Sequence, residues 1–180
     1  MNYEEDKPIS YCGIFGIYGY EGASAQVYYG LHALQHRGQE ASGIVTRSFN
    51  GDNKPHFNIV KGEGLVSEVF EDLSILSDVL IGNSAIGHNR YSTTGTAKSR
   101  KNIQPFMVNY RMGNLAIGHN GNLTNAKELR EELVNEGAIF QTTSDTEVIL
   151  HLIARSKLDN QIDQIIEALQ LSDQSDYRVY

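Results

Sequence analysis

The chain contains a single cysteine, Cys12, among its 180 residues. One cysteine forms no internal disulfide and builds neither a cysteine-rich zinc site nor an iron–sulfur cluster. The fold must therefore be held by a hydrophobic core, and a chain of this length with 40% hydrophobic residues has enough material for one. Cys12 itself has two interpretations, as a small apolar side chain that fills the core or as a nucleophile.

Charge and hydropathy exclude several classes of partner. The net charge is −7, and the 15 Lys and Arg residues are scattered, so we expect no nucleic-acid binding. No run of about eighteen apolar residues occurs, so no membrane span is predicted. The segment Met1–Tyr11 is acidic and polar, unlike a secretory signal, and together with the single cysteine it indicates a cytoplasmic location.

The spacing of apolar residues predicts a mixture of strands and helices. Strands are expected over 12–18, 44–47, 57–60, 84–91 and 115–119, and helices over 24–35, 65–76, 122–134, 144–154 and 161–171. Ser144 followed by Glu147 is a capping-box pattern at the start of one helix. Because strands and helices do not alternate regularly, the pattern favours an α+β fold over a doubly wound sheet.

Four polar, glycine-containing or hydroxyl-rich segments follow or flank the expected strands, where functional sites are usually built. They are residues 36–40 (HRGQE), 89–95 (NRYSTTG), 118–122 (GHNGN) and 143–145 (TSD). Taken singly, each has a structural explanation: Asn120-Gly121 suits a hairpin turn, Asp145 suits a helix cap, and Arg90 suits a surface ion pair. Their joint occurrence, in this order behind Cys12, predicts a catalytic site.

This order of motifs closely resembles the class II glutamine amidotransferases, and among them the amidophosphoribosyltransferase family. The matching segments are CGIFG at 12–16, QHRGQE at 35–40 with SGI at 42–44, RYSTTG at 90–95, NIQPF at 102–106, HNGNL at 119–123 and SDTE at 144–147. The glucosamine-synthase branch differs at two of these segments, where its sequences resemble Tyr-Arg-Gly and Arg-Trp-Ala-Thr. This chain has HRG and RYST there. The resemblance covers residues 12 to about 170. It implies an N-terminal-nucleophile hydrolase fold, a four-layer αββα sandwich.

The resemblance implies that Cys12 is the nucleophile that attacks glutamine and that it becomes the first residue of the mature protein. An α-amino group titrates near 7.7–8.0 and is a suitable base for the thiol, whereas the amide that joins Tyr11 to Cys12 is not basic. We therefore expect Met1–Tyr11 to be a propeptide, and residues 12–180 to be the glutaminase domain.

The resemblance also assigns the remaining site residues. The side-chain amide of Asn120 and the backbone N–H of Gly121 would form the oxyanion hole. Arg90 would bind the α-carboxylate of glutamine, and Asp145 its α-ammonium group. The same pocket would be lined by Tyr91, Thr93 and Phe106. Arg37 would lie near Cys12 and order a loop over bound glutamine. By contrast, His36, His88 and His119 are expected to be structural.

The chain departs from the family pattern in two respects. It lacks the acidic, glycine-containing loop with which the phosphoribosyltransferase domain binds phosphoribosyl pyrophosphate, so that domain is absent. It also ends in residues 172–180 (SDQSDYRVY), where the family continues with more strands, so we expect the fold to be truncated at its C-terminus. We expect no metal and no cofactor in this chain, with magnesium needed only in the absent domain.

Three functions remain open from the sequence. The first is a glutaminase domain that binds L-glutamine and supplies ammonia to a phosphoribosyltransferase domain. The second is a stand-alone N-terminal-nucleophile amidase, which would not need the pair Arg90 and Asp145 to recognise a zwitterion. The third is a non-catalytic fragment. An open sheet edge promotes pairing between chains, so we expect a homo-oligomer.

Overall fold

The computed structural model describes residues 12–49, 54–91 and 100–172, and its strands form two separate sheets. The larger is antiparallel throughout, with the order β1-β4-β2-β3. The smaller is the antiparallel hairpin β5-β6. The strands are β1 (Gly13–Tyr18), β2 (Ala41–Phe49), β3 (Pro55–Glu63), β4 (Ser84–Arg90), β5 (Phe106–Tyr110) and β6 (Gly113–Ile117).

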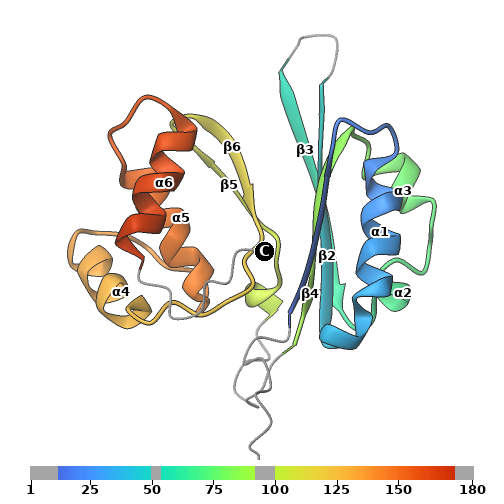
Figure 1. Ribbon diagram of the computed structural model, residues 1–180, viewed down its shortest axis with the longest axis horizontal. Helices are drawn as coiled ribbons and strands as arrows, with labels where there is room; N and C mark the ends of the chain where they lie inside the picture. Colours follow the sequence, from blue (N-terminus) through green and yellow to red (C-terminus); the bar gives the residue numbers. More distant parts are fainter. Residues whose placement is uncertain (1–11, 50–53, 92–99, 173–180) are drawn as a thin grey trace, which may run out of the picture.

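Helices cover the outer side of each sheet (Figure 1). Helices α1, α2 and α3 lie on one side of the four-stranded sheet, and α4, α5 and α6 lie beyond the hairpin. The helices are α1 (Ala23–Ala33), α2 (Val66–Val69), α3 (Ile75–Asp78), α4 (Ala126–Asn135), α5 (Asp145–Arg155) and α6 (Gln161–Leu171), with short 3-10 turns at Gln35–Arg37 and Arg100–Asn102. Helices and strands therefore occupy separate layers, which confirms the predicted α+β class.

Two hydrophobic cores hold these layers together. One lies between α1 and the four-stranded sheet, where Val27, Leu31 and Ile44 are fully buried. The other lies between the hairpin and the C-terminal helices and includes Val148 and Leu152. Each sheet is thus anchored on its outer side, and the inner sides of the two sheets face each other (Figure 1).

The single helix expected over 65–76 is two short helices, α2 and α3. The chain turns between them because the Asp72 carboxylate accepts a hydrogen bond from the backbone N–H of Ser74 at 2.9 Å. Asp and Ser side chains offer the backbone such local alternatives to helical hydrogen bonds. The long-helix prediction was therefore wrong at 70–74.

Strand β5 is absent from the sequence-based prediction. Its sequence, FMVNY, is almost continuously apolar and is only five residues long, so it lacks the clear alternation that marks a half-buried strand. The turn to β6 is completed by Gly113, whose φ of 101° is a conformation that favours glycine. Among the described residues, no helix combines the length and the apolar character needed to cross a membrane.

Candidate active site

A cavity of about 500 Å³ lies where the end of the four-stranded sheet meets the segments around the hairpin. The four-stranded sheet contributes one wall and the C-terminal half of the chain contributes the rest. The lining residues are Cys12, His88, Arg90, Tyr91, Asn102, Gln104, His119, Gly121, Asn122, Leu123, Ala126, Thr143, Ser144 and Asp145. Residues from five separate segments therefore converge on one space that contains the only thiol in the chain.

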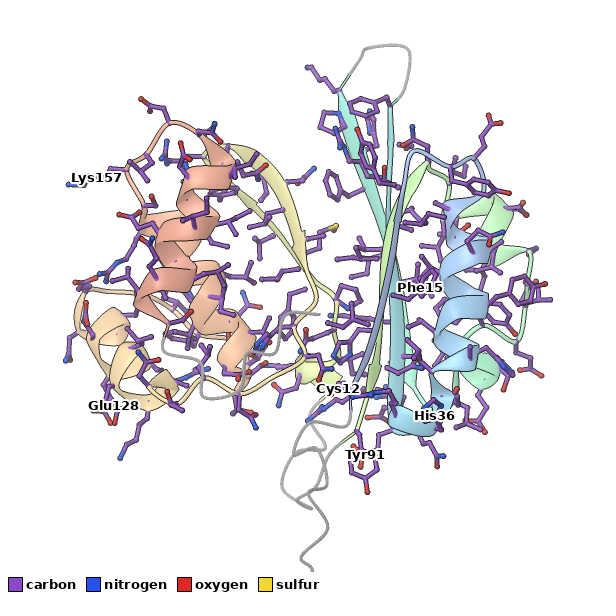
Figure 2. All side chains as sticks on the ribbon, viewed as in Figure 1. Cys12, Phe15, His36, Tyr91, Glu128 and Lys157 are labelled. Atoms are coloured by element: carbon purple, nitrogen blue, oxygen red, sulfur yellow. The ribbon has the colours of Figure 1, made fainter. Side chains whose placement is uncertain are left out.

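Cys12 lies directly before β1, at the end of the sheet between the two halves of the molecule, with Tyr91 nearby (Figure 2). Its Sγ lies 3.9 Å from the carbonyl oxygen of Tyr91. Burial raises the pKa of the Cys12 thiol, and the positive charges of Arg90 and Arg37 offset only part of that effect. The thiol is consequently protonated at neutral pH and requires a base before it can act as a nucleophile.

Two side chains bind the carbonyl oxygen of Cys12. Asn120 Nδ2 donates a hydrogen bond to it at 2.9 Å, and Arg37 Nε donates another at 3.2 Å. These donors come from opposite halves of the chain, so they fix the backbone of Cys12 relative to both. The expected position of Arg37 beside Cys12 is confirmed.

The loop that carries Asn120 and Gly121 is held through its neighbour His119. The backbone N–H of His119 donates to Gln104 Oε1 at 2.7 Å, and His88 Nε2 lies 3.2 Å from the carbonyl oxygen of His119. Because that oxygen is only an acceptor, the proton of a neutral His88 belongs on Nε2. Burial lowers the pKa of His88 to about 4, so the ring is neutral at physiological pH.

Gln104 is placed by a close crossing of its own segment over β2. A Cβ atom at Gly43 would collide with the backbone carbonyl oxygen of Gln104, so only glycine allows this approach. Lys61 reinforces the crossing, because its Nζ donates to the carbonyl oxygens of Ile103 at 2.6 Å and Pro105 at 3.3 Å. The SGI motif thus supports the loop of Asn120 indirectly.

Asp145 begins α5 and turns its carboxylate toward the same loop. Its Oδ2 accepts a hydrogen bond from the backbone N–H of Leu123 at 3.1 Å, and its Oδ1 lies 3.8 Å from His119 Nδ1, a contact that is ionic only when the ring is protonated. Burial raises the pKa of Asp145, but its interactions with His119 and the N–H groups of Leu123 and Thr146 outweigh burial and lower it. The carboxylate is therefore ionised at neutral pH.

The structure brings most of the predicted site residues together. Five of them line the cavity, and Arg37 and Asn120 contact Cys12 directly. The five are Cys12, Arg90, Tyr91, Gly121 and Asp145. Phe106 does not reach this cavity and instead lies under the ammonium group of Lys61, 5.2 Å from ring centre to Nζ, in a neighbouring cavity. Thr93 lies outside the described residues.

Sequence reasoning missed several residues of the cavity wall. Asn102 is buried and makes two hydrogen bonds with Thr143, from Nδ2 to Oγ1 at 2.8 Å and from the Thr143 N–H to Oδ1 at 3.1 Å. Gln104 was likewise not assigned. Both lie in the NIQPF motif, so the motif itself was the available signal. His88 and His119, expected to be structural, line the cavity while also making the loop contacts described above.

The arrangement contains the parts needed for amide cleavage. A thiol, a side-chain amide donor, a guanidinium group and an ionised carboxylate share one cavity or its immediate edge. The guanidinium and carboxylate groups suit the two charges of a free amino acid. Among the described residues, no three His, Cys, Asp or Glu side chains come together as metal ligands would.

Comparison with known proteins agrees with this geometry. Residues 88–170 match the model of a glutamine amidotransferase domain. An amidophosphoribosyltransferase of Lacticaseibacillus casei is 47% identical over 158 residues, which is 88% of this chain and 78% of that protein. The chain belongs to the amidophosphoribosyltransferase family.

Longer relatives show the same similarity over one part of their length. Amidophosphoribosyltransferase 1 of Arabidopsis thaliana, a chloroplastic protein, is 50% identical over 93% of this chain and 28% of its own length. The solved structure of the glutamine phosphoribosylpyrophosphate amidotransferase of B. subtilis superposes with a TM-score of 0.79 at 46% identity. It matches 89% of this chain and 33% of that one. The chain thus spans about a third or less of these two amidophosphoribosyltransferases.

Proposed function

We propose that this chain hydrolyses L-glutamine to glutamate and ammonia through a thioester on Cys12. The observation that carries the proposal is the cavity in which Cys12 lies with Arg90 and Asp145, because a guanidinium and a carboxylate together match the zwitterionic end of a free amino acid. The match to a glutamine amidotransferase domain supports it.

The chemistry follows from the groups in the cavity. The free α-amine of Cys12 takes the thiol proton, and the thiolate attacks the side-chain amide carbon of glutamine. Asn120 and the N–H of Gly121 stabilise the oxyanion of the tetrahedral intermediate. The carbon–nitrogen bond then breaks, the amine returns the proton to the leaving ammonia, and water hydrolyses the thioester to release glutamate and regenerate the thiol. Tyr91 lines the glutamine pocket in this proposal.

Removal of Met1–Tyr11 is part of the same proposal. The buried Cys12 thiol has a raised pKa, so it needs a base close by. The nearest candidate is its own α-amine, which exists only after the bond to Tyr11 is cut. The leader is therefore a propeptide, and residues 12–180 form the glutaminase domain. The layers seen in Figure 1 support the four-layer αββα arrangement of the N-terminal-nucleophile hydrolases.

In a complete enzyme, the ammonia passes to phosphoribosyl pyrophosphate in the first step of purine synthesis. This part of the proposal rests on the names of the relatives, since the chain matches about a third or less of the longer ones. The phosphoribosyltransferase domain is the partner that receives ammonia, and magnesium acts there rather than in this chain. The chain itself works without a cofactor, in the cytoplasm, as part of a homo-oligomer.

A comparison of three amides tests the proposal. L-glutamine carries both charged groups, 4-carbamoylbutanoate lacks the α-ammonium, and 4-aminobutanamide lacks the α-carboxylate. We expect ammonia from L-glutamine alone, and none from the Cys12→Ala variant. Equal hydrolysis of all three amides would indicate a general amidase instead.

A further inference from the structure

We propose that Glu147 and Arg130 are positioning residues that hold the Asp145 wall of the cavity in place and so set the affinity for substrate. The wall is the segment 141–145, of which Thr143, Ser144 and Asp145 line the cavity. Neither Glu147 nor Arg130 lines that cavity. The consequence for substrate rests on the proposed function, whereas the bracing of the segment does not.

Glu147 binds the start of this segment through both carboxylate oxygens. Oε1 accepts the backbone N–H of Gln141 at 2.8 Å, and Oε2 accepts the N–H of Thr142 at 2.8 Å and its hydroxyl at 2.7 Å. The residue is 9% exposed. A buried carboxylate with three donors from two adjacent residues fixes that stretch of backbone strongly, because hydrogen bonds to charged groups are worth more than neutral ones.

These contacts replace the capping box that the sequence predicted. Ser144 does cap α5, since its Oγ accepts the N–H of Thr146 at 3.3 Å. Glu147, however, accepts hydrogen bonds from the N–H groups of Gln141 and Thr142, whereas the N–H of Ser144 donates to Thr142 Oγ1. The Glu147 side chain thus holds the loop that precedes α5, and not the first turn of α5 itself.

Arg130 binds the same segment from a different helix, α4. Its two terminal nitrogens donate to the carbonyl oxygens of Thr142 at 3.0 Å and Ser144 at 2.8 Å. Its guanidinium also lies over the ring of Phe140, 3.9 Å from the ring centre, and that ring contacts His151 at 4.4 Å between centres. Arg130 therefore satisfies the carbonyls of the segment while Glu147 satisfies its N–H groups.

Glu147 and Arg130, with their hydrogen bonds to the segment 141–145, are called the brace below. Glu147→Gln is its sharpest test. Glutamine has nearly the same shape, but its NH₂ group replaces one carboxylate oxygen and meets a backbone N–H, so one donor faces another. Arg130→Lys keeps the positive charge but loses the planar fork that reaches two carbonyls at once. Glu131→Gln and Arg155→Lys are matched controls, because their side chains make exposed ion pairs with Lys127 and with Glu132 and Glu136.

Two measurements on the full chain separate bracing from substrate recognition. Hydrogen–deuterium exchange of the peptide spanning 138–146 reports the brace directly. The rate of Cys12 alkylation by 6-diazo-5-oxo-L-norleucine, a glutamine analogue, reports recognition of the charged end, while iodoacetamide reports thiol reactivity alone. In both test variants we expect faster exchange in 138–146 and a drop of about tenfold or more in analogue labelling, since small displacements at a site are costly. The rate of iodoacetamide labelling in the test variants should stay within about twofold of wild type. Both labelling rates in the two control variants should do the same, as expected for substitutions at exposed sites.

The outcomes test the brace and its role in substrate recognition separately. Unchanged exchange in 138–146 would overturn the brace. Faster exchange with undiminished analogue labelling would overturn the role in substrate recognition, and equal losses with both reagents would reassign the residues to general stability. A wild-type protein that reacts with iodoacetamide but not with the analogue would refute the proposed function, and the recognition role with it, while exchange still decides the brace.

Discussion

Asn120 and Cys12 are joined by a hydrogen bond of 2.9 Å across 108 residues of sequence, from the side-chain amide to the backbone carbonyl oxygen. This contact fixes the proposed oxyanion donor against the residue that carries the nucleophile. A donor that is already held in place costs little reorganisation when charge develops on the substrate. The hydrogen bond that positions Asn120 beside Cys12 thus supports the proposed role of Asn120 in the oxyanion hole.

Replacing Asn120 with alanine should reduce the rate of glutamine hydrolysis while leaving the fold intact. Loss of one oxyanion donor costs on the order of 10²–10³ in rate. Because Asn120 is exposed, the free energy of unfolding should change by less than about 1 kcal/mol. Ammonia release and urea unfolding measure the two effects, with Asn109→Ala on the hairpin as control. Full activity in Asn120→Ala would remove this residue from the oxyanion hole.

Arg90→Lys should weaken glutamine binding more than it slows the chemical step. Lysine keeps the positive charge that lowers the pKa of Cys12, but it lacks the two-pronged donor that fits a carboxylate. We expect KM to rise about tenfold or more, in line with the loss of one or two charge-assisted hydrogen bonds. Arg47→Lys is the matched control, since Arg47 lies over Phe49, outside this cavity. An unchanged KM would argue for a substrate without an α-carboxylate.

Because His88 is buried as a neutral ring, the free energy of unfolding should fall as the pH is lowered into mild acid. Its pKa is about 4 in the folded protein and near 6.5 when unfolded, so the unfolded chain binds the proton first as the pH falls. The stability that depends on neutral His88 is complete above about pH 6.5 and is lost as the pH falls toward 4. By linkage, the loss between pH 7 and pH 4.5 is about 2–3 kcal/mol.

Urea unfolding at the two pH values measures this loss. The variant His88→Gln keeps a donor for the carbonyl oxygen of His119 but has no titrating ring, so its stability should fall less than that of the wild type over the same range. Equal losses in the two proteins would show that His88 does not carry this pH dependence.

The longer helices were predictable because their apolar residues repeat at helical spacing and cover a core. Helices α1, α5 and α6 lie close to their expected ranges for this reason. The helix expected over 65–76 failed because one Asp72 side chain competes with the helical hydrogen bonds, a local effect that periodicity does not register. The short strand β5 carries no clear period and was missed.

The candidate site was predictable only where a motif contained the residue. Cys12, Arg90 and Asp145 were identified through motifs, and the structure places all three in one cavity. The supporting contacts were not predictable, because they join residues far apart in sequence. Lys61 meets Ile103 across 42 residues, and Asn102 meets Thr143 across 41. Such pairings depend on how the two halves of the molecule pack, which local patterns do not encode.

The intact mass of the purified full chain, before and after reaction with 6-diazo-5-oxo-L-norleucine, shows whether Cys12 becomes an N-terminal nucleophile that recognises glutamine. We expect a mass that lacks Met1–Tyr11 and that gains one adduct, with no adduct in Cys12→Ala. A full-length mass with no adduct in the wild type would contradict the claim that Cys12 becomes a free N-terminal nucleophile that recognises glutamine.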